Sequence, residues 1–136
     1  MMRRSRANWV AGCLMLLSAI LLFSPGKSHG LDIAMGFAPN VLNIQSSGTV
    51  VTVHTDLNYS LVDVYTVYLN GLAIKSWKID NCGDFVAKFS MDQVKKLPGL
   101  VIGDYNTFQF VGLTVDGEPF VREQDIMIID VVPQAR

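Results

Sequence analysis

His54, Cys82 and a few pairs of acidic residues are the side chains of this 136-residue sequence that could do chemistry. His54 lies in the alternating stretch 49–55, so one face of that stretch should be buried and the other solvated. A nucleophilic triad needs a histidine held beside serine or cysteine, and residues 31–136 contain no G-x-S-x-G elbow. We therefore expect His54 to be a solvent-facing strand residue rather than a catalytic base.

The acidic residues form three close pairs, namely Asp80 with Asp84, Asp116 with Glu118, and Glu123 with Asp125. Paired carboxylates can serve as acid and base in glycoside hydrolysis or as oxygen ligands for calcium. The segment 80–84 gathers polar groups in a turn, but a D-x-[DN]-x-[DN]-G calcium loop is absent from the sequence. We expect these residues to form turns and a charged surface, with no catalytic residue, metal ligand or cofactor.

Cys82 and Trp77 are the two candidates for a binding or redox role. Cys82 is the one cysteine after residue 30, so it has no internal disulfide partner and could pair with another chain. The neighbouring carboxylates disfavour a reactive thiolate, and we expect an inert or partly buried thiol. Trp77 stands between Lys75 and Lys78, so it is the aromatic residue best placed for stacking on a carbohydrate, although large rings in strands more often belong to the core.

The first thirty residues predict where these side chains work. Arg3, Arg4 and Arg6 precede the uncharged stretch Trp9–Phe23, and Ser28 and Gly30 supply the small residues of a cleavage site. This order is typical of a secretory signal peptide. We expect residues 1–30 to be removed and the rest to be exported to the periplasm or the extracellular space. An uncleaved segment would instead anchor the chain in a membrane.

Residues 31–136 are long enough for one domain, and their charge bears on possible partners. They contain seven Lys and Arg residues against twelve Asp and Glu residues, a net charge of about −5. Proteins that bind nucleic acid or anionic membranes usually carry a basic patch, so this balance argues against both partners. The single cysteine of this part indicates that a packed core, rather than disulfides, stabilises the domain.

Short runs rich in Val, Ile, Thr, Tyr and Phe recur through residues 31–136, separated by Gly, Asn, Asp and Pro. This is the pattern of an all-β protein. The predicted strands are 41–45, 49–55, 64–70, 73–79, 84–90, 105–115 and 120–131. Seven strands joined by short turns favour a mainly antiparallel β-sandwich or small barrel. Residues 31–40 and 132–136 are expected to be loose ends or additions at an edge.

Turn and cap residues punctuate these strands. Ser46-Ser47-Gly48 should join the first two strands as a tight turn, and 70–71 (Asn-Gly) and 116–117 (Asp-Gly) should form hairpin turns. Ser90 and Gln93 match a capping box, and Pro98-Gly99 would end the short helix that they start. We expect this helix to cross one end of the sandwich and to bury Val94 and Leu97.

The last third carries a resemblance. The segments 111–120 (VGLTVDGEPF) and 125–129 (DIMII) resemble a pattern G-x-L-x-D-G-x-P-F…D-x-I-x-[IV], and 67–71 and 86–89 fit the same layout. This layout is similar to immunoglobulin-like β-sandwich modules of secreted bacterial proteins, over about residues 41–131. The resemblance implies an accessory, spacer or adhesion role without catalysis, and it carries no catalytic residue over to this chain.

The sequence thus predicts an exported, non-catalytic immunoglobulin-like β-sandwich with a structural, adhesion or protein-binding role. A protein partner would be bound through an exposed edge strand or a cluster of loops. A carbohydrate- or calcium-dependent binding module is the first alternative, and a small hydrolase is the second. The exposure of Trp77 separates the carbohydrate alternative from the others.

Overall fold

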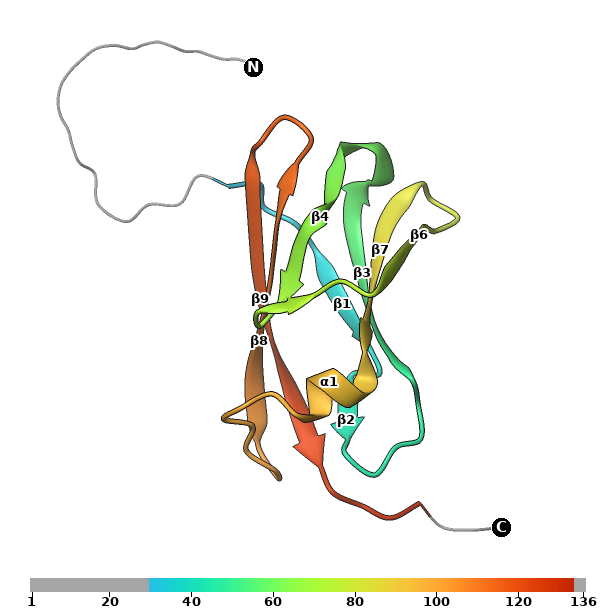
Figure 1. Cartoon of the computed structure of the whole chain (residues 1–136), viewed down its shortest axis with the longest axis vertical. Coiled ribbons are helices and arrows are strands. Elements are labelled where there is room, and N and C mark those ends of the chain that lie inside the picture. The colour runs from blue at the N-terminus through green and yellow to red at the C-terminus, as the bar shows by residue number, and fades with distance from the viewer. Residues whose placement is uncertain (1–29, 134–136) are drawn as a thin grey trace, which may run out of the picture.

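The computed structural model describes residues 30–133, which form two packed β-sheets and one short helix (Figure 1). One sheet contains, in spatial order, β1 (Met35–Ala38), β3 (Val50–Asn58), β7 (Asp84–Ser90) and β6 (Ser76–Ile79). The other contains β2 (Val41–Asn43), β9 (Pro119–Ile129), β8 (Tyr105–Thr114), β4 (Val62–Leu69) and β5 (Leu72–Ala73). The 3-10 helix η4 (Tyr59–Leu61) precedes β4, and the helix α1 (Met91–Lys95) follows β7. The expected all-β sandwich with one short helix is confirmed.

The strands number nine in the described residues, not about seven, for two reasons. Part of the expected loose end, Met35–Ala38, pairs with β3 and forms an edge strand of the four-stranded sheet. The expected strand 73–79 is two strands that belong to different sheets. The chain crosses between the sheets at Ile74, whose N–H donates to Val67 O at 3.2 Å, and Lys75, whose N–H donates to Lys88 O at 2.8 Å.

The turn at 46–48 is also different from the expectation. Ser46 N–H donates to Asn43 O at 2.9 Å, and Ser46 Oγ accepts from Gly48 N–H at 3.0 Å, so the chain does turn there. The turn joins β2 to β3, however, and these strands lie in different sheets, so it is a crossover rather than a hairpin. The strand β2 runs parallel to β9, while the other strand pairs are antiparallel.

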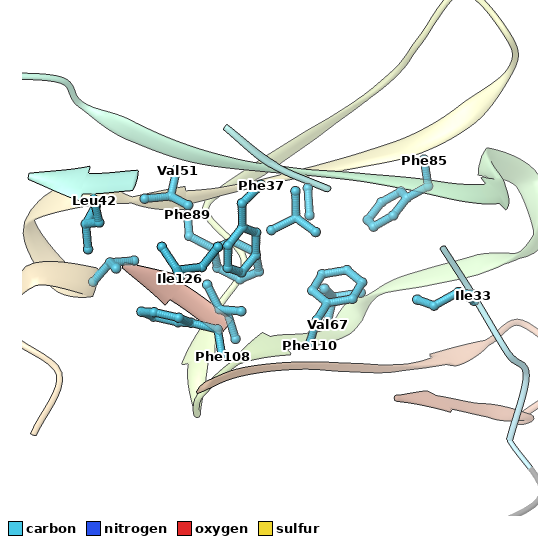
Figure 2. Close-up of a cluster of buried hydrophobic side chains, with 14 of the residues drawn as sticks. Ile33, Phe37, Leu42, Val51, Val67, Phe85, Phe89, Phe108, Phe110 and Ile126 are labelled. Carbon is cyan, nitrogen blue, oxygen red and sulfur yellow. The ribbon is translucent and has the colours of Figure 1, made fainter. Parts of the chain in front are cut away.

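Alternating apolar side chains from both sheets meet in the core between them (Figure 2). Phe37 packs edge-to-face on Phe108 with ring centroids 5.6 Å apart, and Phe89 packs on Phe110 at 6.3 Å. These four rings bridge the two sheets. Each fully buried aromatic or aliphatic side chain of this kind stabilises the fold by about 1.5–3 kcal/mol relative to exposure.

The two predicted hairpin turns and the predicted helix cap are confirmed. Asn70 and Gly71 have φ angles of 46° and 83° in the hairpin between β4 and β5. Gly117 has a φ of 86° in the hairpin between β8 and β9. Ser90 Oγ accepts from Gln93 N–H at 3.4 Å and caps α1, which buries Met91 and Val94 and closes the lower end of the sandwich in Figure 1. Leu97 packs against the same core.

Candidate functional site

A wide bulge in β4 shapes the side of the sandwich on which Tyr65 and Trp77 lie. Asp63 pairs with Leu113 and Tyr68 pairs with Val111, so the four residues of 64–67 face only one residue of β8, at position 112. The Thr66 hydroxyl bridges the bulge: it accepts from Leu113 N–H of β8 at 2.8 Å and donates to Asp63 O of its own strand at 2.7 Å. Bulges of this kind turn a side chain out of the regular alternation.

The bulge brings Tyr65 of one sheet against Trp77 of the other. Their ring centroids are 5.7 Å apart and their planes lie at 80°, which is an edge-to-face contact. Tyr65 is 78% exposed, whereas Trp77 is half-buried and packs on the core. Edge-to-face pairs are favourable by about 0.5–1.5 kcal/mol beyond their buried area. The contact therefore fixes an exposed phenol ring on a tryptophan that the core holds in place.

Two open strand edges flank this aromatic pair. Within residues 30–133, β6 is the last strand of its sheet and pairs with β7 alone. The short β5 pairs with β4 only at Tyr68 and Leu69. On the side of β4 opposite β8, no strand of the described part of the chain therefore pairs with residues 62–66. Ile79, two residues after Trp77 and on the same face of β6, is 52% exposed. Open edges offer unpaired N–H and C=O groups to an added strand.

Two lysines and a hydrogen-bonded turn border the open edge of β6. Lys75 and Lys78 flank Trp77 and are exposed. In the turn that follows, Asp80 Oδ1 accepts from Asp84 N–H at 2.9 Å and from Cys82 N–H at 2.8 Å. The bond from Asp84, assisted by the Cys82 bond and the charge of His54, holds the pKa of Asp80 below its ordinary value, although desolvation opposes this. The carboxylate thus holds the end of β6 rather than facing a ligand.

His54 is exposed on β3, opposite Val86 of β7, as expected for a solvent-facing strand residue. The other acidic pairs do not converge with it. Glu123 accepts from Gln109 Nε2 at 3.3 Å and Asp125 accepts from Thr107 Oγ1 at 2.7 Å, both on the surface of the five-stranded sheet. Within residues 30–133 no three His, Cys, Asp or Glu side chains are grouped closely enough to hold a metal ion.

Cys82 was expected to be an inert or partly buried thiol. It is exposed, so the partly buried form of that expectation is wrong, and the inert form stays a prediction. The reason is local: Gly83 has a φ of 84° and turns the chain outward at Cys82, while Asp80 and Asp84 hold both ends of the turn. Pairing of Cys82 with another chain stays a prediction. Trp77 is neither fully exposed nor buried, so its role in carbohydrate stacking also stays a prediction.

The cavity between the sheets beneath α1 is lined by apolar side chains, including Phe37, Leu42, Val51, Val94 and Phe108. Its volume of about 10 Å³ is close to the space that one water molecule needs. It is too small for a substrate or a cofactor, and its lining offers no polar group to orient one. The surface beside Tyr65 and Trp77 is therefore the better candidate site.

No family model, curated protein or solved structure matches this chain. Between residues 30 and 133, no helix combines the length and apolar character that crossing a bilayer would require. The expected signal peptide, residues 1–30, lies outside the described residues except for Gly30. The candidate site thus stands on its geometry alone.

The aromatic pair was only half predicted. Trp77 stands out in the sequence by its polar neighbours, whereas Tyr65 is not distinguished there from the other aromatic residues of the strands. One signal in the sequence could have found it: the inward residues of β4 change phase between Val64 and Val67, which indicates a bulge. Nothing in the sequence near Tyr65 indicates that its partner is Trp77, because Trp77 lies in the other sheet.

Proposed function

We propose that this chain is an exported, non-catalytic binding module with an immunoglobulin-like sandwich, and that it recognises an extended segment of a protein partner. The observation that carries this proposal is the Tyr65–Trp77 pair, held between the open edges of β4 and β6. Peptides that add a strand to such an edge gain main-chain hydrogen bonds and place alternate side chains in neighbouring pockets. Tyr65 and Ile79 would receive those side chains.

The strand order supports the immunoglobulin-like part of the proposal. Such sandwiches place their first, second, fifth and fourth strands in one sheet and their third, sixth and seventh in the other. The order β1-β3-β7-β6 against β9-β8-β4 follows this arrangement when β1 and β2 count as one interrupted first strand and β5 as an addition. The resemblance of residues 41–131 points to the same class of module.

Export is the part of the proposal that rests on residues 1–30. The charged start, the apolar stretch and the small residues at Ser28 and Gly30 support a signal peptide. The intact mass of the protein recovered from the exported fraction should correspond to a chain that begins near Leu31. A mass that includes residues 1–30 would contradict cleavage and indicate a membrane anchor.

The binding part is tested with a phage-displayed library of random linear peptides. We expect enriched peptides with alternating apolar residues, and we expect Tyr65→Ala to weaken their binding at least about tenfold, or about 1.4 kcal/mol. Val115→Lys is the matched control, because Val115 is also exposed but lies in the hairpin between β8 and β9. Peptide binding that ignores Tyr65→Ala, or no enrichment at all, would contradict the proposal.

A glycan array separates the carbohydrate alternative. The exposed ring of Tyr65 and the lysines beside Trp77 are compatible with a sugar, which is the observation that keeps this alternative. Glycan binding that Tyr65→Ala abolishes, together with no enriched peptide, would favour a carbohydrate-binding module. Binding that requires calcium would favour the calcium-dependent form.

A further inference from the structure

The outward face of the five-stranded sheet carries two rows of apolar side chains, although it points away from the core. Tyr68 of β4, Val111 of β8 and Val121 of β9 are cross-strand neighbours and form one apolar row. Tyr68 is 39% exposed and Val121 42%. The pair Leu113 and Pro119 continues the apolar surface on one side of this row.

The far end of the same face repeats the pattern. Tyr105 of β8, Met127 of β9 and Val41 of β2 are neighbours in register and form a second apolar row. Tyr105 is 63% exposed. Apolar residues at outward positions on three neighbouring strands are the mark of an interaction surface rather than of scattered exposure.

The four-stranded sheet shows what a solvated face looks like in the same molecule. Its outward positions include Thr52 and His54 of β3, Lys88 of β7 and Lys78 of β6. The apolar Val86 lies between His54 and Lys78 in register and is fully buried there. The exposed outward positions of the four-stranded sheet are therefore polar, as usual, whereas those of the five-stranded sheet include apolar rows on either side of a polar band.

We propose that this face binds a second copy of the chain, sheet on sheet, about a two-fold axis that runs along β8. Such a rotation places β9 of each copy over β4 of the other. It leaves positions along the strand direction unchanged, so each row of one copy faces the same row of the other. Val121 then packs on Tyr68 of the second copy, and Leu113 lies opposite its own counterpart. Apolar rows thus meet apolar rows at both ends of the face, which is what an isologous interface requires.

The rotation keeps the like charges of the two copies apart. Its outward strand residues include three carboxylates, Asp63 of β4 and Glu123 and Asp125 of β9, while the central strand β8 carries no charged residue. Because the rotation exchanges β4 and β9, Asp63 lies opposite Pro119 of the second copy rather than opposite a carboxylate. The carboxylates of the two β9 strands are separated by about two strand spacings, or about 10 Å.

The polar residues between the two apolar rows, Thr107, Gln109, Glu123 and Asp125, are already hydrogen-bonded to one another in the single chain. Thr107 donates to Asp125 at 2.7 Å, and Gln109 donates to Glu123 at 3.3 Å. Polar groups that already have partners cost less to bury than unpaired ones. The band can therefore be covered without leaving these side chains unsatisfied.

The size of the face suits a dimer. Its strands β2, β9, β8, β4 and β5 contain 3, 11, 10, 8 and 2 residues. At about 3.4 Å per residue and about 4.8 Å per strand, the plane of the sheet measures roughly 550 Å², not counting the surface of the projecting side chains. Stable protein interfaces bury about 800 Å² from each partner. Two sheets that pack face to face cross at about 30°, so the strands of the two copies need not be strictly aligned.

Sedimentation velocity of the exported chain under reducing conditions tests the dimer, with the reductant excluding disulfides through Cys82. We expect a concentration-dependent dimer whose Kd rises at least about tenfold in Val121→Lys and in Tyr68→Glu. His54→Lys is the matched control, because it introduces the same lysine as Val121→Lys at an exposed outward strand position of the other sheet. Thermal unfolding of each variant confirms that it is folded, and Tyr105→Glu at the far end provides a second disruption if one of them is not.

Mixing the two disrupted variants tests the two-fold axis. A mixed dimer would bring the lysine introduced on β9 of one variant against the glutamate introduced on β4 of the other. Dimers should therefore return when Val121→Lys and Tyr68→Glu are combined. No dimer in the mixture would overturn the axis along β8. A wild-type chain that is monomeric at all concentrations, or variants that dimerise like the wild type, would overturn the proposal.

Discussion

The ring of Phe120 lies directly over the Cα of Gly112, its register partner on β8: a Cβ atom at position 112 would come within 2.4 Å of Phe120 Cζ. Two further atoms of the same ring would lie 2.9 and 3.1 Å away. Phe120 is fully buried and packs against Phe110, so its ring has little room to move. Gly112 therefore lets the largest side chain of β9 enter the core, beside the bulge that exposes Tyr65.

Gly112→Ala should consequently destabilise the protein by about 1–3 kcal/mol, the usual cost of overpacking a core. Gly36→Ala is the matched control, because nothing lies within 4 Å of the added Cβ on β1. Urea unfolding of both variants measures the difference. Equal stabilities for the two variants would contradict the close packing of Phe120 on β8.

Thr66→Val should disturb the bulge of β4. The valine has the same shape but loses the hydroxyl that accepts from Leu113 N–H and donates to Asp63 O. We expect a loss of about 1 kcal/mol, the usual contribution of a hydrogen bond, and a change in the tryptophan fluorescence as Tyr65 shifts relative to Trp77. Thr52→Val, on the outward face of β3, serves as control and should change neither. An unaltered fluorescence spectrum in Thr66→Val would show that the bulge does not position Tyr65.

Gly117→Val should cost about 1–3 kcal/mol, because a β-branched residue is strained at the φ of 86° that this turn requires. Nothing lies within 4 Å of an added Cβ there, so the cost would come from the backbone alone. Gly117→Asn is the control, since asparagine tolerates this conformation and should retain most of the stability. Thermal unfolding compares the two, and a Gly117→Val variant as stable as the wild type would refute the strained turn.

Asp80 should make the stability of the fold depend on acid. Hydrogen bonds from Asp84 and Cys82 lower the pKa of Asp80 in the folded state, so its contribution is fully present above the unfolded value of 3.8. That contribution is lost as the pH falls through the folded pKa. Asp80→Asn keeps an acceptor oxygen without the charge, so its unfolding free energy should fall less steeply below about pH 4. Parallel slopes for the two proteins in urea unfolding across this range would contradict the role of Asp80.

The local features of the chain follow from its amino-acid sequence. Alternation of β-branched and aromatic residues predicts most strands, because a strand with one buried face needs an apolar residue at every second position. The turns at Asn70, Gly71 and Gly117 follow from residues that tolerate positive φ, and α1 follows from Ser90, whose side chain satisfies an otherwise free N–H. Each of these features depends on a few adjacent residues.

The grouping of strands into sheets and the contacts between distant side chains become visible only in the folded chain. In the sequence, residues 73–79 look like one continuous strand. The chain changes sheets at Ile74 and Lys75 because their N–H groups bond to Val67 in one sheet and Lys88 in the other, and these contacts leave no local signal in the sequence. Tyr65 meets Trp77 for the same reason: the contact joins two sheets. Local preferences set backbone angles, whereas strand pairing depends on packing between distant segments, and that packing determines which rings stay exposed.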